Sequence, residues 1–250
     1  MSNVILLSIL QGIAEFLPIS SSGHLVIAEH LLGIKEGGMA LDLFLHFGTL
    51  ASIVVYYHKT IANILMKFDV KFMAKIILSC LPAIVVYLLL KDTIDHTFEN
   101  PRVVGAFLMF TGAVLIGTRY IPTGAKEVSC FRAFLMGLGQ AFAILPGVSR
   151  SGMTLAVARA GKVDSSRSAE FSFLMSAPLI VGGCVLELLD CGGSPDLGGF
   201  SWGLVMFGMF LAFVFGLAAL YVLERILKSK WFWLFGPYCI LAGLLTVFMI

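Results

Sequence analysis

Runs of about 20 apolar residues recur along almost the whole chain, and they restrict the folds that it can adopt. A helix of about 20 residues crosses the hydrocarbon core of a bilayer, where every backbone polar group needs a partner within the protein. Hydrophobic residues make up 59% of the sequence and charged residues 13%, about half of the charged share of soluble domains. The pattern predicts an all-α polytopic membrane protein.

Some apolar runs are long enough for full spans, whereas others have about half that length. We expect six full spans at residues 40–58, 74–90, 102–118, 168–188, 201–223 and 231–250. The shorter runs form two pairs, residues 3–17 with 24–32 and residues 131–145 with 153–160, and each pair is separated by a polar break. Two half-length helices around a polar break predict a re-entrant hairpin.

The two halves of the chain have the same order, a hairpin followed by three spans. A shift of 129 positions matches Gln11 with Gln140 and Ser20 with Ser149. The same shift superposes all three pairs of spans. We therefore predict a single integral membrane domain over residues 1–250, with one repeat at about 1–121 and a second at about 130–250.

Loop charges predict the orientation of the repeats. Lys and Arg gather at residues 59–75, 119–132 and 224–230, whereas residues 92–99 and 189–199 lean acidic. Because short loops rich in Lys and Arg stay in the cytoplasm, the two hairpins enter from opposite sides and the repeats have inverted topology. In such folds the broken helices meet near the membrane midplane and form the binding site. The net charge of +2 is spread over these loops, so we expect no nucleic-acid partner.

Glu15 is the only charged residue between the N-terminus and His24. A carboxylate within a membrane costs at least about 2.5 kcal/mol, so it is expected to have a function. Gln11 lies four residues earlier on the same helix face, and the two side chains suit a divalent cation such as Mg²⁺. Alternatively, Glu15 pairs with Arg150 across the repeat and only locks the hairpins together.

Hydroxyl side chains flank both polar breaks, next to the start of the following half-helix. They are Ser20, Ser21 and Ser22 in the first hairpin and Ser149, Ser151 and Thr154 in the second. Helix N-termini attract phosphate, and Arg150 adds a planar fork suited to phosphate oxygens. Each hydroxyl alone is better explained by helix capping, but the mirrored pair around an Arg favours phosphate binding.

His24 is the candidate nucleophile or general acid–base of this group. It follows three serines and lies within two turns of Glu15, and phosphoryl transfer requires a nucleophile or a proton shuttle. Asp42 and His46 share a helix face at i and i+4, and we expect them to form a structural pair or a contact at the mouth of the site.

Two motifs together resemble the paired signature of bacterial undecaprenyl pyrophosphate phosphatases. They are QGIAEFLPISSSGH at residues 11–24 and PGVSRSGMT at residues 146–154. The resemblance extends to EFSF at residues 170–173 and to the hydropathy of the whole chain. It implies a multi-pass enzyme of the bacterial inner membrane that hydrolyses undecaprenyl pyrophosphate to undecaprenyl phosphate and inorganic phosphate. Such an enzyme recycles the lipid carrier for peptidoglycan synthesis and confers bacitracin resistance.

The resemblance also implies roles for the motif residues. Glu15 and Gln11 match the acidic motif of the family, whose first position is Glu or Gln, and His24 matches its proposed nucleophile or acid–base. Ser21 matches a further hydroxyl of the site, and the phosphate-binding motif is matched by Ser149, Arg150, Ser151 and Thr154. We expect Mg²⁺ or Ca²⁺ to offset the pyrophosphate charge, and His24, oriented by Glu15, either to attack phosphorus or to activate water.

Further expectations concern the surroundings of the site. The isoprenoid tail of the substrate stays in the bilayer, and the site opens to the outer, periplasmic side. A homodimer is possible through small-residue surfaces around Gly203, Gly208 and Gly216. The alternative function is a polyprenyl-phosphate flippase or transporter, because inverted repeats with broken helices also build transporters. A proton-shuttling set of His24, Glu15 and Arg150 favours the enzyme.

Overall fold

The computed structural model describes residues 1–33, 39–190, 192, 197 and 199–249, and the regular elements of these residues are helices. The first half contains α1 (Ser2–Ala14), α2 (Ser21–Leu32), α3 (Met39–Tyr56), α4 (His58–Met66), α5 (Val70–Phe98), α6 (Pro101–Gly117) and the short 3-10 helix η1 (Thr118–Tyr120). The second contains α7 (Cys130–Phe142), α8 (Arg150–Ala160), α9 (Ser165–Asp190), α10 (Trp202–Lys228), the 3-10 helix η2 (Phe232–Leu234) and α11 (Phe235–Met249). The predicted all-α class is confirmed.

Within the described residues, five helices are long and apolar enough to cross a membrane. They are Val70–Lys91, Pro101–Tyr120, Ser165–Leu189, Trp202–Lys228 and Phe232–Met249. The sixth predicted span, residues 40–58, corresponds to α3, whose segment Leu41–Tyr56 is apolar but shorter than these five. These helices make the chain a multi-pass membrane protein.

Polar residues mark where several helices begin. The side chains of Asp69, Ser129 and Ser201 accept backbone N–H groups at the starts of α5, α7 and α10. Asn100 does the same for α6, where Pro101 occupies the first turn. These side chains supply partners for N–H groups that the helix itself leaves unpaired, and proline at the first position loses no hydrogen bond. The local sequence therefore sets these helix starts.

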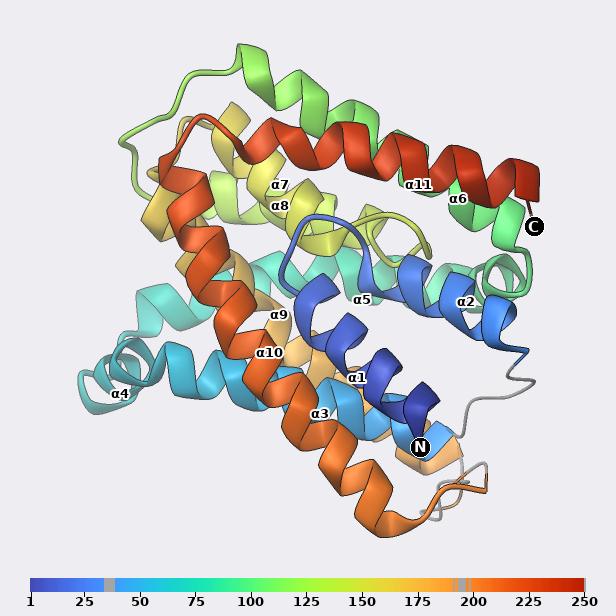
Figure 1. The fold of residues 1–250 in the computed structure, drawn as a ribbon. Coiled ribbons are helices and arrows are strands. Elements are labelled where there is room, and N and C mark those ends of the chain that lie inside the picture. The colour runs from blue at the N-terminus through green and yellow to red at the C-terminus, as the bar shows by residue number, and fades with distance from the viewer. Residues whose placement is uncertain (34–38, 191, 193–196, 198, 250) are drawn as a thin grey trace.

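The last helices of the two halves, α6 and α11, lie side by side (Figure 1). A Cβ atom added to Gly112 would lie 2.6 Å from the backbone oxygen of Gly236. A Cβ atom added to Gly236 would likewise lie 2.6 Å from the backbone oxygen of Gly112. Gly105 approaches Gly243 in the same way, with 2.8 Å between an added Cβ and the Gly243 oxygen. The two contacts run in opposite order along the helices, so α6 and α11 are antiparallel. This close backbone approach requires glycine.

Helices of one half also pack against helices of the other, because α10 contacts α1 and α3 and α5 contacts α7. A Cβ on Gly208 would lie 2.7 Å from Ser8 Oγ, and one on Gly216 would lie 2.5 Å from Ser52 Oγ. Gly208 and Gly216 therefore pack against α1 and α3 of the same chain, whereas a Cβ on Gly203 would meet no atom within 4 Å. The homodimer itself stays a prediction.

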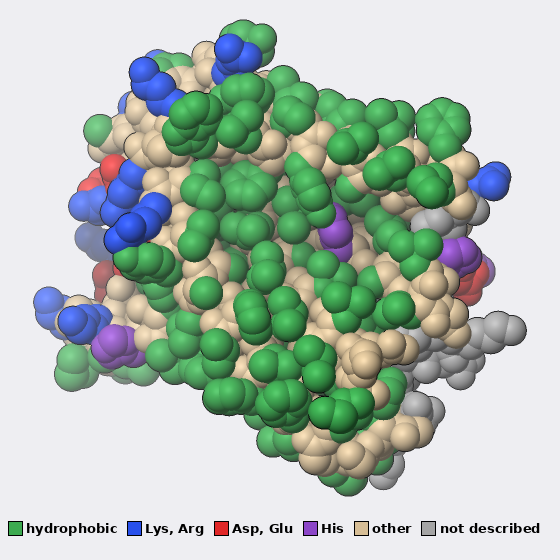
Figure 2. All heavy atoms as spheres, viewed as in Figure 1, with side chains coloured by type: hydrophobic (Ala, Val, Ile, Leu, Met, Phe, Trp, Pro, Cys, Tyr) green, Lys and Arg blue, Asp and Glu red, His purple; other side chains and the backbone are tan. Residues whose placement is uncertain are grey.

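The surface has the character expected in a bilayer (Figure 2). Hydrophobic side chains cover the middle of the visible face, whereas Lys and Arg side chains gather at its left end, the end that carries α4 in the same view of Figure 1. The Lys-rich and Arg-rich segments thus lie together at one end of the molecule, separated from the opposite end by an apolar belt.

Candidate active site

The two polar breaks pack directly against each other. A Cβ added to Gly23 would lie 2.9 Å from the Cα of Gly147, and Gly147 itself has a positive φ of 93°. The Ser151 hydroxyl donates a 3.1 Å hydrogen bond to the carbonyl of Leu17, which joins α8 to the first break. Segments more than 100 residues apart in sequence therefore form one compact site.

Each break ends in a serine that caps the following helix. Ser20 Oγ accepts the N–H of Gly23 at 3.3 Å to begin α2, and Ser149 Oγ accepts the N–H of Gly152 at 3.1 Å to begin α8. Ser20 adopts a positive φ of 71°, which is uncommon for a residue with a side chain. Both capping residues line the cavity described below, so two helix N-termini, with their partial positive charge, begin at its wall.

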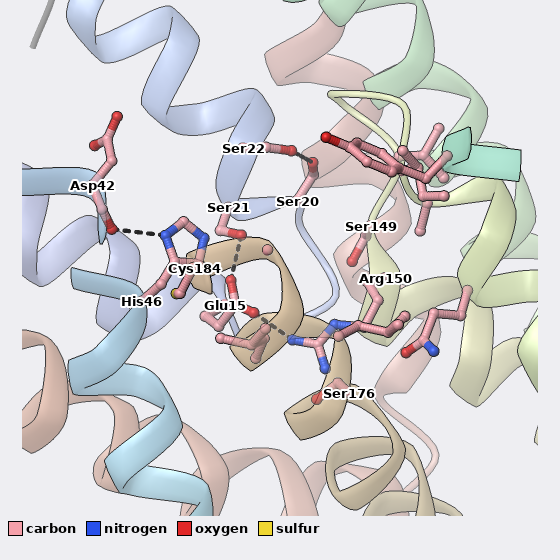
Figure 3. A pocket seen from close by; sticks show the side chains of 18 of the residues that line it. Glu15, Ser20, Ser21, Ser22, Asp42, His46, Ser149, Arg150, Ser176 and Cys184 are labelled. Carbon is pink, nitrogen blue, oxygen red and sulfur yellow. Dashed lines mark hydrogen bonds and ion pairs between the residues drawn. The ribbon is translucent and has the colours of Figure 1, made fainter. Parts of the chain in front are cut away.

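A cavity of about 690 Å³ lies where the breaks meet helices α3, α5, α7 and α9 (Figure 3). Its polar lining comes from the first break (Glu15, Ser20, Ser21, Ser22), from the second (Ser149, Arg150), and from the surrounding helices (Asp42, His46, Tyr87, Lys91, Gln140, Ser176, Glu187). Apolar residues complete the wall, among them Phe98, Leu179 and Ile180. The cavity combines polar groups for a charged headgroup with an apolar lining.

Glu15 is the centre of the polar cluster and is only 8% exposed. Its Oε1 forms an ion pair with the guanidinium of Arg150. This pairing across the repeat is one of the two interpretations of Glu15 that follow from the sequence. Its Oε2 accepts a hydrogen bond of 2.6 Å from Ser21 Oγ and another of 3.2 Å from Gln11 Nε2. The carboxylate is thus held by one cation and bonded to one hydroxyl that faces the cavity (Figure 3).

Three side chains at this wall keep buried polar atoms without a hydrogen-bond partner in the described part of the chain. They are Arg150, through Nη1, Gln140, through both atoms of its amide, and Asp42, through Oδ1. Gln140 is 2% exposed and lines the cavity. Because buried polar groups are almost always paired in native proteins, unpaired donors on a cavity wall indicate the place of a polar ligand.

The structure places His24 outside the cavity lining. Its Nδ1 lies 2.8 Å from the carbonyl oxygen of Ser20, and its Nε2 lies 2.8 Å from the Tyr238 hydroxyl on α11. The two rings stack with centroids 5.6 Å apart. Both ring nitrogens are therefore occupied, and the predicted orientation of His24 by Glu15 is not what the structure has.

Three other predicted residues are buried but do not line the cavity. Gln11 bonds Glu15 through Nε2, and Ser151 bonds the carbonyl of Leu17. Thr154 Oγ1 bonds the carbonyl of Arg150 at 2.9 Å and the hydroxyl of Ser172 at 2.6 Å. These side chains hold the elements that carry the cavity residues.

Several residues line the cavity beyond those predicted to bind phosphate or to react. Asp42 and His46, expected as a structural pair or a contact at the mouth of the site, both face the cavity from α3. Gln140 is the residue that the 129-position shift matches with Gln11, so the repeat contained the signal for it. Nothing in the sequence points to Lys91 or Glu187, because their position depends on how α5 and α9 pack.

The described residues fit the predicted cation site poorly. They contain no group of three or more His, Cys, Asp and Glu residues that could hold a metal ion. Gln11 presents its amide nitrogen to Glu15, while its Oε1 is buried without a partner among the described residues. Since Arg150 already balances the Glu15 charge, Gln11 and Glu15 do not form a cation site on their own in this arrangement.

Comparison with known proteins relates this site to a family. The family model described as bacitracin resistance protein BacA matches residues 4–245. An undecaprenyl-diphosphatase of Rhodopirellula baltica is 40% identical over 249 residues, which cover 98% of this chain and 96% of that protein. Undecaprenyl-diphosphatases of Desulfosudis oleivorans and Thermotoga maritima are 37% and 36% identical, with at least 97% of each chain covered. A match over nearly the whole chain, including both polar breaks, shows that the protein belongs to the BacA family of bacitracin resistance proteins.

Proposed function

We propose that this protein hydrolyses undecaprenyl pyrophosphate to undecaprenyl phosphate and inorganic phosphate, the activity for which its relatives are named. The observation that carries the proposal is the cluster of Ser21, Glu15 and Arg150 at the cavity wall, which combines a nucleophile, a base and a phosphate-binding cation. The reaction would return the lipid carrier to peptidoglycan synthesis and confer bacitracin resistance.

Anion binding is supported by groups that lack partners inside the protein. Nη1 of Arg150 and the amide of Gln140 are buried donors at the cavity wall, and the N-termini of α2 and α8 begin beside them. A guanidinium and two helix N-termini suit the oxygens of a pyrophosphate. We therefore expect the terminal phosphate to bind between Arg150 and the serines of both breaks.

The geometry favours Ser21 over His24 as the attacking group. Ser21 Oγ faces the cavity and donates to Glu15 at 2.6 Å, the arrangement of a hydroxyl and its general base. Oγ attacks the terminal phosphorus, the bond to the bridging oxygen breaks, and the electron pair stays on undecaprenyl phosphate. The Ser21 proton passes to Glu15. In this mechanism His24 has a structural role. Its Nδ1 bonds the carbonyl of Ser20, the residue next to Ser21.

We propose that a divalent cation, Mg²⁺ or Ca²⁺, binds at the site, although no step described above depends on it. Gln11 and Glu15 do not form its site alone, so we propose that it enters with the substrate, whose phosphate oxygens would supply ligands. Bound in this way, it would offset the charge of the pyrophosphate.

We also propose the inverted-repeat architecture, with α1 and α2 and then α7 and α8 as re-entrant hairpins. Support comes from the shared order of helices in the two halves, from the antiparallel contact of α6 with α11, and from the packing of Gly23 on Gly147. Helices α1, α2, α7 and α8 have 13, 12, 13 and 11 residues, too few to span a bilayer each.

The proposed site lies in the inner membrane and opens to its outer, periplasmic face. α5 begins beside Lys71 and Lys75 at the Lys-rich end of the molecule, and the positive-inside rule places that end in the cytoplasm. The α5 residues that line the cavity, Tyr87, Lys91 and Phe98, belong to the opposite end of that helix. The apolar part of the lining offers a path for the isoprenoid tail.

The test is phosphate release from a polyprenyl pyrophosphate by purified protein in detergent. Ser21→Ala and Glu15→Gln should each lower kcat at least about 100-fold, because they remove the nucleophile or its base. Arg150→Lys keeps the charge but loses the fork, so it should mainly raise KM. Ser201→Ala is the matched control, since Ser201 caps α10 outside the cavity.

The outcomes separate the enzyme from the transporter alternative, which the comparisons do not support. Release at the wild-type rate by all three folded site variants would contradict the assignment of the site. Absence of release by the wild type, with lipid transfer between vesicle leaflets intact, would contradict the enzyme and favour the transporter.

A further inference from the structure

We propose that His46 is a further catalytic residue of this site, the base that takes a proton from the water that hydrolyses the phosphoserine formed at Ser21. The inference rests on the proposed function and assigns a role that the attack by Ser21 leaves open. The orientation of the His46 ring in the cavity is the observation that supports the proposal.

The contacts of His46 fix its tautomer. Its Nδ1 lies 2.8 Å from the main-chain carbonyl oxygen of Asp42, one turn earlier on α3. A carbonyl oxygen only accepts hydrogen bonds, so Nδ1 carries the proton and Nε2 of the neutral ring carries a lone pair. The ring is therefore prepared to accept a proton at Nε2.

This lone pair faces the reacting groups. Figure 3 shows the His46 ring between Asp42 and Ser21, with its second nitrogen pointing toward Ser21 and Glu15. His46, Ser21 and Glu15 line the same cavity, and no described residue forms a hydrogen bond with Nε2. Nε2 is thus open to a water molecule beside a phosphate on Ser21.

Proton balance shows why a second base is needed. After the first step Glu15 holds the proton of Ser21, and it returns this proton to Oγ when the phosphoserine breaks. In that second step the water oxygen bonds to phosphorus, the Oγ–P bond breaks, and inorganic phosphate forms. One proton of the water then has to leave for another acceptor, and Nε2 of His46 takes it and later releases it to water in the cavity.

Three neighbouring groups are less suited to this role. Arg150 has no acceptor, the amide of Gln140 is not a base, and both ring nitrogens of His24 are occupied. The Asp42 carboxylate lines the same wall and keeps a buried Oδ1 without a partner in the described chain. Its negative charge would stabilise the imidazolium that forms on His46.

The experiment follows both products of a substrate that is radiolabelled at its terminal phosphate. Wild type should release undecaprenyl phosphate and inorganic phosphate at equal rates. In His46→Gln, phosphate release should fall about 100-fold, while undecaprenyl phosphate appears in a burst of about one equivalent per protein. The label should accumulate on the protein and map to Ser21.

Controls separate this role from damage to the fold. His58→Gln is the matched variant, because His58 also bonds a main-chain carbonyl, that of Val55, but is exposed and outside the cavity lining. The double variant Ser21→Ala/His46→Gln should show no label. Unfolding temperatures identify misfolded protein, and His46→Asn replaces His46→Gln if the latter does not fold.

Two results would overturn the proposal while wild-type activity stands: normal phosphate release by a folded His46 variant, or slow release without a burst and without label on Ser21. Absence of phosphate release by the wild type would refute the proposed function instead.

Discussion

At the scale of single residues, Glu15 connects stability with chemistry. A buried charge is tolerated when it is paired, and Arg150 supplies the pair to one carboxylate oxygen. The other oxygen bonds the hydroxyl of Ser21, so the ion pair that neutralises Glu15 also orients the proposed base toward the proposed nucleophile. The two sequence-based interpretations of Glu15, a lock between hairpins and a functional group, therefore describe the same geometry.

His24 gives a prediction at this scale. Because it holds the Ser20 carbonyl and the Tyr238 hydroxyl, His24→Ala should slow phosphate release about tenfold, equivalent to about 1.4 kcal/mol, and lower the unfolding temperature. Tyr238→Phe keeps the stacked ring and loses one hydrogen bond, so it should lower the free energy of unfolding by about 1 kcal/mol with kcat nearly unchanged. Kinetics and thermal unfolding in detergent measure both effects.

One result would contradict this structural role of His24. If His24→Ala abolished phosphate release as completely as Ser21→Ala and left the unfolding temperature unchanged, His24 would act on the substrate itself.

At the scale of elements, the halves are held together by helices that approach closely at glycines. The α6 and α11 backbones meet at Gly105 with Gly243 and at Gly112 with Gly236. The second break is tied to the same α6 helix, since Thr111 Oγ1 donates to the carbonyl of Gly147 at 2.9 Å. The packing of α6 on α11 thus supports the loop that precedes Ser149 and Arg150.

A pair of glycine substitutions in α6 tests this packing. Gly112→Ala places a Cβ 2.6 Å from the Gly236 oxygen, and the overpacking should lower the free energy of unfolding by about 1 to 3 kcal/mol. An alanine at Gly117, the last residue of α6, meets no atom within 4 Å and should be neutral or stabilising by up to about 1 kcal/mol. Equal stability of the two variants would contradict the close helix contact.

At the scale of the whole molecule, charge and cavity lie in a consistent order from one end of the molecule to the other. Lys and Arg gather at one end, the apolar belt follows, and the cavity takes residues from the far ends of α5 and α9. In the orientation proposed above, a pyrophosphate headgroup enters from the outer face while its tail stays in lipid.

Thiol accessibility tests this orientation. In a variant with all five cysteines replaced by serine, Glu99→Cys, just beyond α5, should react with an impermeant reagent added outside spheroplasts. Lys67→Cys, which is exposed next to α4, should react only after the membrane is opened. The reverse labelling pattern would place the cavity mouth on the cytoplasmic side.

The sequence predicted most of the helices but only part of the site. Short-range signals such as Asn100-Pro101 and Ser201 identify helix starts, and the mirrored serines identify Ser20 and Ser149 as caps. The sequence does not predict α4, because this helix lies in a Lys-rich segment with the charge pattern of a loop. The role of His24 was predicted from its closeness in sequence to Ser21, and its ring lies on the other side, against Tyr238.

By itself, the sequence determined the all-helical class, the membrane environment and the two polar breaks whose residues line the cavity, because apolar length, caps and buried charge act over one helix at a time. Only the tertiary structure decided that Ser21 bonds Glu15, that Gln140 and Arg150 keep unpaired donors, and that His46 rather than His24 faces the cavity. These outcomes depend on the positions of α3, α7, α9 and α11 relative to the breaks. Such positions follow from packing between residues far apart in sequence, such as Phe16 against Phe173 and Gly23 against Gly147.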